Sequence, residues 1–299
     1  MSKVIVIVGP TASGKSSLGV QLAKKYNGEI INGDAISVYK ELNIGSAKIT
    51  EEEMQGVKHH LIDCLDVSEQ YNVAQFQHSA REAIEEIISR EKLPIVVGGT
   101  GLYVKALLYD YDISNPTDHN DQQYQNYSNE QLYEMLVKAD QKGAMKIHPN
   151  NRRRVIRALQ ICESGMKKSD IEDAQQHKPI YDCLLIGLNA DREIINQRIN
   201  YRVDQMMQQG LQQEVEQLFS KYPYTSHCFQ AIGYKEFIDF VENRTTLSQT
   251  VELIKLHTRQ FAKRQMTWFK NQMEVNWFDI TDQDYQLQIQ QKVEAFINE

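Results

Sequence analysis

The sequence predicts an α/β fold, in which helices cover both faces of a parallel sheet that carries a phosphate-binding loop. Three observations lead to this prediction. Strand patterns alternate with helical patterns along most of the 299 residues, a glycine-rich turn follows the first strand, and one polar stretch interrupts the alternation. Alternating strands and helices favour a parallel sheet, because each helix returns the chain to the end where the previous strand began.

The expected elements follow from hydrophobic periodicity. Short apolar runs predict strands at residues 3–8, 29–32, 93–97, 183–188 and 275–280. Apolar side chains at helical spacing predict helices at residues 16–26, 73–91 and 247–270. Residues 115–178 are polar, rich in Gln and Asn at first and then helical in pattern. We therefore expect a P-loop core of residues 1–114 and 179–299, with an all-helical insertion domain at residues 115–178.

Composition excludes several classes of protein. Hydrophobic residues make up 41% and charged residues 24% of the chain, which is the balance of a folded globular protein. Apolar runs are far shorter than the ~20 residues of a membrane span, so we expect a cytoplasmic protein with no membrane partner. A net charge of −7 argues against non-specific coating of nucleic acid. The dispersed cysteines predict buried, reduced thiols and no zinc cage at Cys64, Cys162, Cys183 and Cys228.

The most specific chemical motif lies between the first strand and the first helix. It fits G-x-x-x-x-G-K-[ST] and consists of Gly9, Pro10, Thr11, Ala12, Ser13, Gly14, Lys15 and Ser16. Its glycines let backbone N–H groups turn toward a phosphate, the helix N-terminus adds positive potential, and the lysine adds a charge. We predict that these eight residues bind a diphosphate or triphosphate, and that Ser16 holds Mg²⁺. The motif does not identify the group attached to the phosphates.

Other charged residues give weaker signals. Lys235, Arg198 and Arg202 are candidates for additional phosphate contacts, although each could equally be a solvated surface charge. The adjacent His59 and His60 point in different directions and have no third ligand at a suitable spacing, so we interpret them as structural. The absence of an N-K-x-D signature argues against a GTPase switch and leaves a kinase-like transferase open.

A basic island between Pro149 and Asp170 stands out from the acidic chain. Arg153 and Arg154 lie four and three residues before Arg157, so a helix would place the three side chains on one face. Such a face could meet RNA phosphates, and a solvated helix surface is the alternative. The same two interpretations hold for the basic side chains within residues 247–270.

Several further blocks are specific when they are taken together in order. They are residues 34–40 with 43–48, residues 59–63, residues 97–103, residues 147–151 with Arg154 and Arg157, and residues 262–265 with Trp268. This set resembles the bacterial transfer-RNA dimethylallyltransferases over nearly the whole chain. The chain departs from the family's pattern at two places. The family usually has Ser and Gln where this chain has Ala35 and Ser37, and it usually has Asp-Pro where this chain has Asp140-Gln141.

The resemblance implies a transferase that moves a dimethylallyl group from dimethylallyl pyrophosphate to the exocyclic amine of a tRNA adenosine. In the family this adenosine is 3′-adjacent to the anticodon. Asp34 matches the family's catalytic base, and Thr100 matches its threonine that contacts the pyrophosphate. Candidate tRNA-binding residues are Asp34, Ala35, Ile36 and Ser37, with Arg153, Arg154 and Arg157 in the insertion. The implied partners are tRNA and dimethylallyl pyrophosphate, with Mg²⁺ as cofactor, and we expect a monomer.

The chemistry agrees with these roles, but other functions stay open. The adenosine amine is a poor nucleophile, so a positioned carboxylate that takes its proton should help. A stacked adenosine must also be swung out to meet a buried electrophile. A P-loop kinase of small molecules, or an enzyme that prenylates adenine nucleotides, would use the same loop. An ATP-dependent RNA-binding module would hydrolyse ATP and consume no dimethylallyl pyrophosphate.

Overall fold

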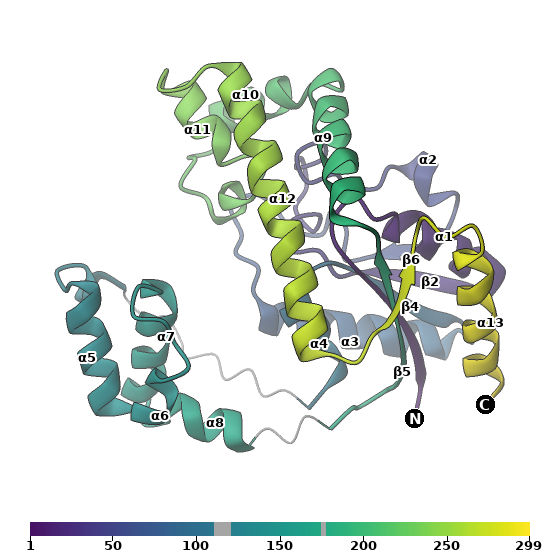
Figure 1. The fold of residues 1–299 in the computed structure, drawn as a ribbon, viewed down its shortest axis with the longest axis horizontal. Helices are drawn as coiled ribbons and strands as arrows, with labels where there is room; N and C mark the ends of the chain where they lie inside the picture. Colours follow the sequence, from purple (N-terminus) through teal and green to yellow (C-terminus); the bar gives the residue numbers. More distant parts are fainter. Residues whose placement is uncertain (111–120, 175–177) are drawn as a thin grey trace. The chain divides into compact units, whose positions relative to one another are not determined.

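The computed structural model describes residues 1–110, 121–174 and 178–299, which form two compact units (Figure 1). The core unit comprises Met1–Leu108 and Ile180–Glu299, and the inserted unit comprises Tyr109–Pro179. The boundary that the sequence predicts between residues 114 and 115 lies outside the described residues. Each unit has a hydrophobic core of its own.

The core unit is built on a six-stranded sheet with the order β3-β2-β4-β1-β5-β6. The strands are β1 Lys3–Val8, β2 Gly28–Asn32, β3 His59–His60, β4 Leu93–Val97, β5 Asp182–Asn189 and β6 Asn276–Asp279. All neighbouring strands pair in parallel, which confirms the predicted α/β fold. Among the described strands, β3 alone was not predicted from the sequence, because two residues are too few to show a periodicity.

Helices cover both faces of this sheet. Side chains of consecutive strand residues point to opposite faces. Ile5 and Ile7 pack in one cluster with side chains of α1 (Lys15–Lys25) and α13 (Tyr285–Asn298). Val4 and Val6 are fully buried on the opposite face. Helix α3 (Val73–Ser89) is absent from the first cluster but contacts β2 and β4, and it therefore covers that second face.

The strand order places the glycine-rich loop at a switch point of the sheet. After β1, the chain forms β2 and β4 on one side of β1, and β5 later pairs with the other side of β1. Ligands of open α/β sheets bind beyond the carboxyl ends of the strands at such a point. Here the segments that follow Val8, Asn32 and Val97 reach the same edge of the sheet. This edge is therefore the expected location of a site.

The core unit contains further helices in its described residues. They are α2 Glu51–Met54, α4 Gly101–Leu108, α9 Arg192–Gln208, α10 Leu211–Lys221, the 3₁₀ turn η2 His227–Gln230, α11 Glu236–Val241 and α12 Leu247–Gln272. Helix α12 starts at a capping box, in which Thr246 and Gln249 bond to each other's backbone N–H groups. It contacts α4, α9 and α11, and it thus connects distant parts of the core unit (Figure 1).

The regular elements in the described residues of the inserted unit are all helices or 3₁₀ turns, and an isolated bridge joins Tyr109 and Pro179. Its elements are the 3₁₀ turn η1 Asp121–Tyr124, α5 Asn129–Ala139, α6 Gln141–Ala144, α7 Arg152–Glu163 and α8 Lys168–Ala174. The buried Asp140 carboxylate accepts the N–H groups of Gly143 (2.8 Å) and Ser169 (2.9 Å). Gln141 is the first residue of α6, a position that also suits the proline usual in the family.

The cysteines are unpaired, as predicted, but their burial differs from the prediction. Cys228 is buried, Cys162 and Cys183 are half-buried, and Cys64 is exposed. The prediction of a buried thiol is wrong for Cys64, because this residue lies on a surface loop that follows the edge strand β3.

None of the helices in the described part of the chain is long and apolar enough to cross a membrane.

Candidate active site at the carboxyl edge of the sheet

The loop after β1 has the backbone that a phosphate-binding turn requires. Gly9 has a φ of 144°, and a Cβ atom there would lie 2.4 Å from the carbonyl oxygen of Leu188. Gly14, with a φ of 91°, leads directly into α1. These two positions therefore need glycine. Ser13 is buried, and its hydroxyl has no protein partner among the described residues.

A cleft of about 120 Å³ opens beside this loop. Its polar lining consists of Thr11, Lys15, Ser16, Asn32, Asp34, Ser37, Ser46, His59, Arg202 and Gln265. Its apolar lining includes Ile30, Ile49, Ile62, Val97 and Phe261. The cleft thus joins a cationic region at the loop to an apolar wall, and Asp34 supplies the only carboxylate among its described lining residues.

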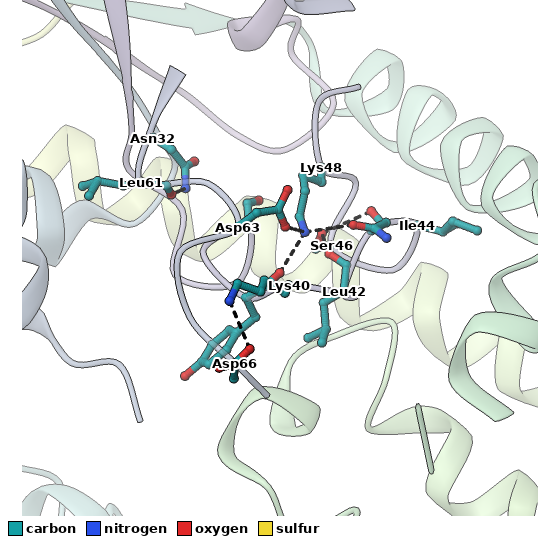
Figure 2. A network of polar contacts seen from close by, with 12 residues as sticks. Asn32, Lys40, Leu42, Ile44, Ser46, Lys48, Leu61, Asp63 and Asp66 are labelled. Atoms are coloured by element: carbon teal, nitrogen blue, oxygen red, sulfur yellow. Dashed lines mark hydrogen bonds and ion pairs between the residues drawn. The ribbon is translucent and has the colours of Figure 1, made fainter. Parts of the chain in front are cut away.

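Asp34 uses one carboxylate oxygen to shape the turn after β2. Oδ1 accepts the N–H groups of Ile36 (2.8 Å) and Ser37 (3.3 Å). Asn32 fixes the same turn, because its side-chain amide donates to the carbonyl oxygens of Asp34 (3.2 Å) and Leu61 (2.9 Å); Figure 2 shows the latter contact. Oδ2 has no hydrogen-bond donor among the described residues. One oxygen therefore caps the turn, and the other is available in the cleft.

Two cations lie in the cleft close to the glycine-rich loop. Burial, together with the nearby Arg202 guanidinium, lowers the pKa of Lys15 to about 7, and Asp34 partly offsets this effect. Lys15 Nζ donates to the carbonyl oxygen of Pro10 at 2.7 Å. Arg202, on α9, donates to the carbonyl oxygen of Ala47 at 3.2 Å and lies 3.5 Å from Thr11 Oγ1. Two half-buried cations beside one carboxylate form a site that favours an anion.

Gln265 connects the two loops that flank the cleft. Its side-chain oxygen accepts the N–H of Thr11 (2.9 Å), and its amide donates to the carbonyl oxygen of Gly99 (3.0 Å). A Cβ atom on Gly99 would lie 2.1 Å from this amide, so a side chain there would displace Gln265 from its contacts. No function was predicted for Gln265 from the sequence. A polar residue in the apolar stripe of the predicted helix at residues 247–270 was the signal that could have identified it.

The structure brings together only part of the predicted site. Thr11, Lys15, Ser16, Asp34 and Ser37 line the cleft, and the other P-loop residues (Gly9, Pro10, Ala12, Ser13 and Gly14) form the adjoining turn. Ala35 and Ile36 flank the lining residues. Of the weaker candidates, Arg202 lines the cleft, whereas Arg198 is exposed on α9.

Two other candidates do not line the cleft. Thr100 begins α4, where its carbonyl oxygen accepts the N–H groups of Tyr103 (3.0 Å) and Val104 (3.2 Å). Lys235 directly precedes α11, and its ammonium lies 3.9 Å from a carboxylate oxygen of the buried Glu236.

The two adjacent histidines lie in different surroundings. His59 lines the cleft, and its Nδ1 lies 2.8 Å from the carbonyl oxygen of Val57. His60 Nε2 lies 2.7 Å from the buried Glu29 carboxylate. Across the described residues there is no cluster of His, Cys, Asp and Glu side chains that could hold a metal ion.

The arginines of the inserted unit fall into two groups. Arg152 donates to the carbonyl oxygens of Tyr124 (2.6 Å) and Tyr127 (2.7 Å), and it thus holds η1 to α7. Arg153 and Arg154 are exposed in the first turn of α7. Arg157 is half-buried, and this burial lowers its pKa. Arg153, Arg154 and Arg157 have no carboxylate partner in the parts of the chain that are described.

Comparisons with known proteins identify the family. The "IPP transferase" family model matches residues 37–272. A tRNA dimethylallyltransferase of Bacillus anthracis is 46% identical over 302 residues, which cover 98% of this chain and 96% of the relative. The structure resembles that of the tRNA isopentenylpyrophosphate transferase of Bacillus halodurans, with 41% identity and a TM-score of 0.77, covering 100% of this chain and 97% of the other. It also resembles a eukaryotic dimethylallyltransferase acting on tRNA, with 33% identity and a TM-score of 0.87, covering 100% and 80% of the two chains. The chain therefore belongs to the IPP transferase family of tRNA dimethylallyltransferases.

Proposed function

We propose that this transferase moves the dimethylallyl group of dimethylallyl pyrophosphate to the exocyclic amine of the tRNA adenosine that is 3′-adjacent to the anticodon. One observation carries the proposal: a single cleft holds a phosphate-binding loop with two cations and a carboxylate that has an available oxygen. The first feature suits the pyrophosphate, and the second suits the proton of the amine.

The pyrophosphate binds at the glycine-rich loop. Backbone N–H groups at the start of α1 and the Lys15 ammonium meet its oxygens, and the buried Ser13 hydroxyl adds a donor. Arg202 is a further ligand, because its guanidinium faces the same end of the cleft. These groups stabilise the negative charge that the leaving pyrophosphate gains in the transition state. Thr100 and Lys235 stay candidates for outer contacts with the pyrophosphate.

The residues of this loop fit a magnesium ion that arrives with the pyrophosphate. Mg²⁺ keeps several waters and takes few protein oxygens where substrate phosphates supply the others. Ser16 lines the cleft at the helix start, and its hydroxyl would be the protein ligand. When bound, the ion would act as a Lewis acid on the leaving group.

Asp34 is the proton acceptor in the proposed reaction. The amine nitrogen forms a bond to the allylic carbon while the bond from that carbon to the pyrophosphate oxygen breaks. The proton of the amine passes to Asp34 Oδ2, and pyrophosphate leaves with the bonding electrons. The apolar wall formed by Ile30, Ile49 and Val97 suits the dimethylallyl group, which carries delocalised positive charge in the transition state.

The tRNA partner is held over a wider surface. The adenosine must leave its stack to reach Asp34, so the surrounding RNA backbone needs separate contacts. We assign these contacts to Arg153, Arg154 and Arg157 of α7, and base contacts to the turn at residues 34–37. The monomeric state and the cytoplasmic location remain predictions from the sequence.

A transfer assay tests this function. Purified protein is incubated with Mg²⁺, radiolabelled dimethylallyl pyrophosphate and unmodified tRNA, and label in the RNA is counted. The proposal requires label in tRNA and none in AMP. Label in AMP would indicate an adenylate prenyltransferase. ATP hydrolysis without consumption of dimethylallyl pyrophosphate would indicate an RNA-binding module that uses the P-loop as a switch.

A further inference from the structure

A carboxylate outside the cleft holds the loop that forms one of the cleft walls. Glu214, on α10, accepts the N–H groups of Asn43 (3.1 Å) and Ile44 (2.8 Å) with Oε2. Its Oε1 accepts the N–H of Gly45 (3.0 Å) and the hydroxyl of Tyr234 (2.9 Å). Four donors from two segments therefore converge on one side chain, which does not itself line the cleft.

Tyr234 completes this anchor. It is fully buried, and its hydroxyl oxygen also accepts the N–H of Ser46 at 3.2 Å. Burial raises the pKa of Tyr234 well above its usual value, so the hydroxyl stays protonated and donates to Glu214. Its ring lies against Gly45, where a Cβ atom would come within 2.6 Å of Cζ. Loop 43–47, as we name this segment, is thus fixed by hydrogen bonds and by close packing.

Lys48, the residue that directly follows loop 43–47, also holds this loop in place (Figure 2). Lys48 is buried, and its ammonium donates to the carbonyl oxygen of Tyr39 (2.8 Å) and to Asn43 Oδ1 (2.9 Å). It also pairs with the Asp63 carboxylate. Lys48 therefore connects Asn43 of the loop to Tyr39 and Asp63, whereas Glu214 connects the loop to helix α10.

Loop 43–47 reaches the reaction site directly. Ser46 and Ala47 line the cleft, and the Ala47 carbonyl oxygen accepts a hydrogen bond from Arg202. Arg202 in turn lies beside Thr11 of the glycine-rich loop. A displacement of the loop would move both a wall of the cleft and the acceptor that orients this guanidinium.

From these contacts we propose that Glu214 is a positioning residue, which holds loop 43–47 so that Arg202 faces the pyrophosphate. The inference rests on the proposed function. It predicts that loss of Glu214 weakens the use of dimethylallyl pyrophosphate and leaves tRNA binding unchanged.

The test compares Glu214→Ala and Glu214→Gln with wild-type protein. Hydrogen bonds to a charged group are strong enough for their loss to correspond to roughly a tenfold to hundredfold change. We expect the KM for dimethylallyl pyrophosphate to rise by about that factor in Glu214→Ala, with a smaller rise in Glu214→Gln, which keeps one acceptor oxygen. The kcat per folded molecule should fall as well, because Arg202 also stabilises the charge on the leaving pyrophosphate in the transition state, whereas the Kd for tRNA should change much less.

Glu41→Gln is the matched control. Glu41 bonds to Lys221 (2.7 Å) and Tyr222 (2.8 Å) near the end of α10, but these contacts are exposed and do not hold the cleft wall. Exposed pairs of this kind contribute little, so the KM should stay at the wild-type value. Urea unfolding of each variant separates a loss of stability from a change in KM.

If Glu214→Ala does not fold, Glu214→Gln and Tyr234→Phe carry the same test. A KM for dimethylallyl pyrophosphate within twofold of wild type in the folded variants would overturn the inference, and so would a change confined to tRNA binding. If wild-type protein transfers no label, the proposed function fails instead. The role of Glu214 is then decided by the Kd for dimethylallyl pyrophosphate alone, measured in the same variants.

Discussion

The two oxygens of the Asp34 carboxylate carry two different functions. Oδ1 holds the turn through Ile36 and Ser37, whereas Oδ2 is available in the cleft. We predict that Asp34→Asn binds both substrates but slows the chemical step by roughly 10²–10⁴-fold, the usual contribution of a positioned proton acceptor. Asn can keep the acceptor oxygen of the turn but cannot take the proton. Single-turnover kinetics at saturating substrates would measure the change.

Stability measurements on the same samples separate the two functions of Asp34. A melting temperature near that of wild type, together with a slow chemical step, assigns the defect to proton transfer. Asp66→Asn is a suitable control, because Asp66 is an exposed carboxylate that pairs with Lys40 (Figure 2). If Asp34→Asn transfers the prenyl group at the wild-type rate, Asp34 is not the base.

Lys15 gives a prediction about pH. Its pKa of about 7 lies below the ordinary value of 10.5 mainly because of burial. The ammonium form, which a pyrophosphate prefers, is therefore present below pH 7 and is lost as the pH rises above 7. The Kd for dimethylallyl pyrophosphate should increase up to about tenfold per pH unit between pH 7 and 9, as for any ligand that requires one protonated group. Binding at fixed Mg²⁺ measures this slope.

The Lys15→Ala variant provides the comparison for that slope. It should bind dimethylallyl pyrophosphate more weakly at pH 7, since a phosphate-paired ammonium contributes roughly 1.5–3 kcal/mol for each hydrogen bond. It should also lose most of the pH dependence, because Arg202 stays charged throughout this range. An equal slope in both proteins would assign the titration to another group.

At the scale of elements, the sequence predicts a structural unit best when all of its parts are adjacent in the chain. The unit formed by β1, the glycine-rich loop and α1 could be predicted because the strand, the turn and the helix are adjacent in sequence. Strand β3 and the contacts of Glu214 could not. Both depend on residues that are far apart in the chain, and neither leaves a local pattern. Helix α9 was also missed, although Ile195, Ile199 and Val203 form a narrow apolar stripe.

The residues of the active site also divide into those that the sequence predicts and those that require the tertiary structure. Lys15 and Asp34 could be predicted from motifs, whereas Arg202 could not be separated from a solvated charge until the fold placed it beside Thr11. Likewise, the function of Gln265 depends on the approach of α12 to both Thr11 and Gly99. Such residues require the tertiary structure because their partners come from other elements.

Helix α7 carries a prediction for RNA binding. Changing Arg153, Arg154 and Arg157 to Ala should weaken tRNA binding and lower the slope of log affinity against log salt by up to about three units. The three charges have no carboxylate partners among the described residues, so the protein should lose little stability. Lys138→Ala, an exposed charge on α5, is the control. An unchanged slope would assign the arginines to a solvated surface.

At the scale of the whole molecule, a buried charge network joins elements on the side of the sheet that carries β3. Glu29 of β2 is buried and contacts His60 of β3 (2.7 Å), Arg90 (2.6 Å) and Lys92 (2.9 Å). Burial alone would raise the pKa of Glu29, but hydrogen bonds from these three residues outweigh it and lower the pKa from 4.5 to about 2. The carboxylate therefore stays charged and paired at neutral pH, where it connects β2, β3 and the turn between α3 and β4.

This network predicts how stability changes in acid. A carboxylate whose pKa is lowered by folding stabilises the protein above its unfolded pKa, and this stabilisation is lost as the pH falls through the folded pKa. For Glu29 the loss should begin near pH 4.5 and continue toward pH 2. At pH 3.5 it should amount to about 1 kcal/mol of the free energy of unfolding, from the same linkage. Glu29→Gln should be less stable at pH 7, and its stability should fall less between pH 7 and pH 3.5 than that of wild type. Urea unfolding at the two pH values measures both effects.

Glu86→Gln is the control, because Glu86 pairs with the same Arg90 but is half exposed, and exposed pairs contribute little. An equal loss of stability in wild type and Glu29→Gln would mean that other carboxylates, and not this network, set the acid sensitivity of the fold.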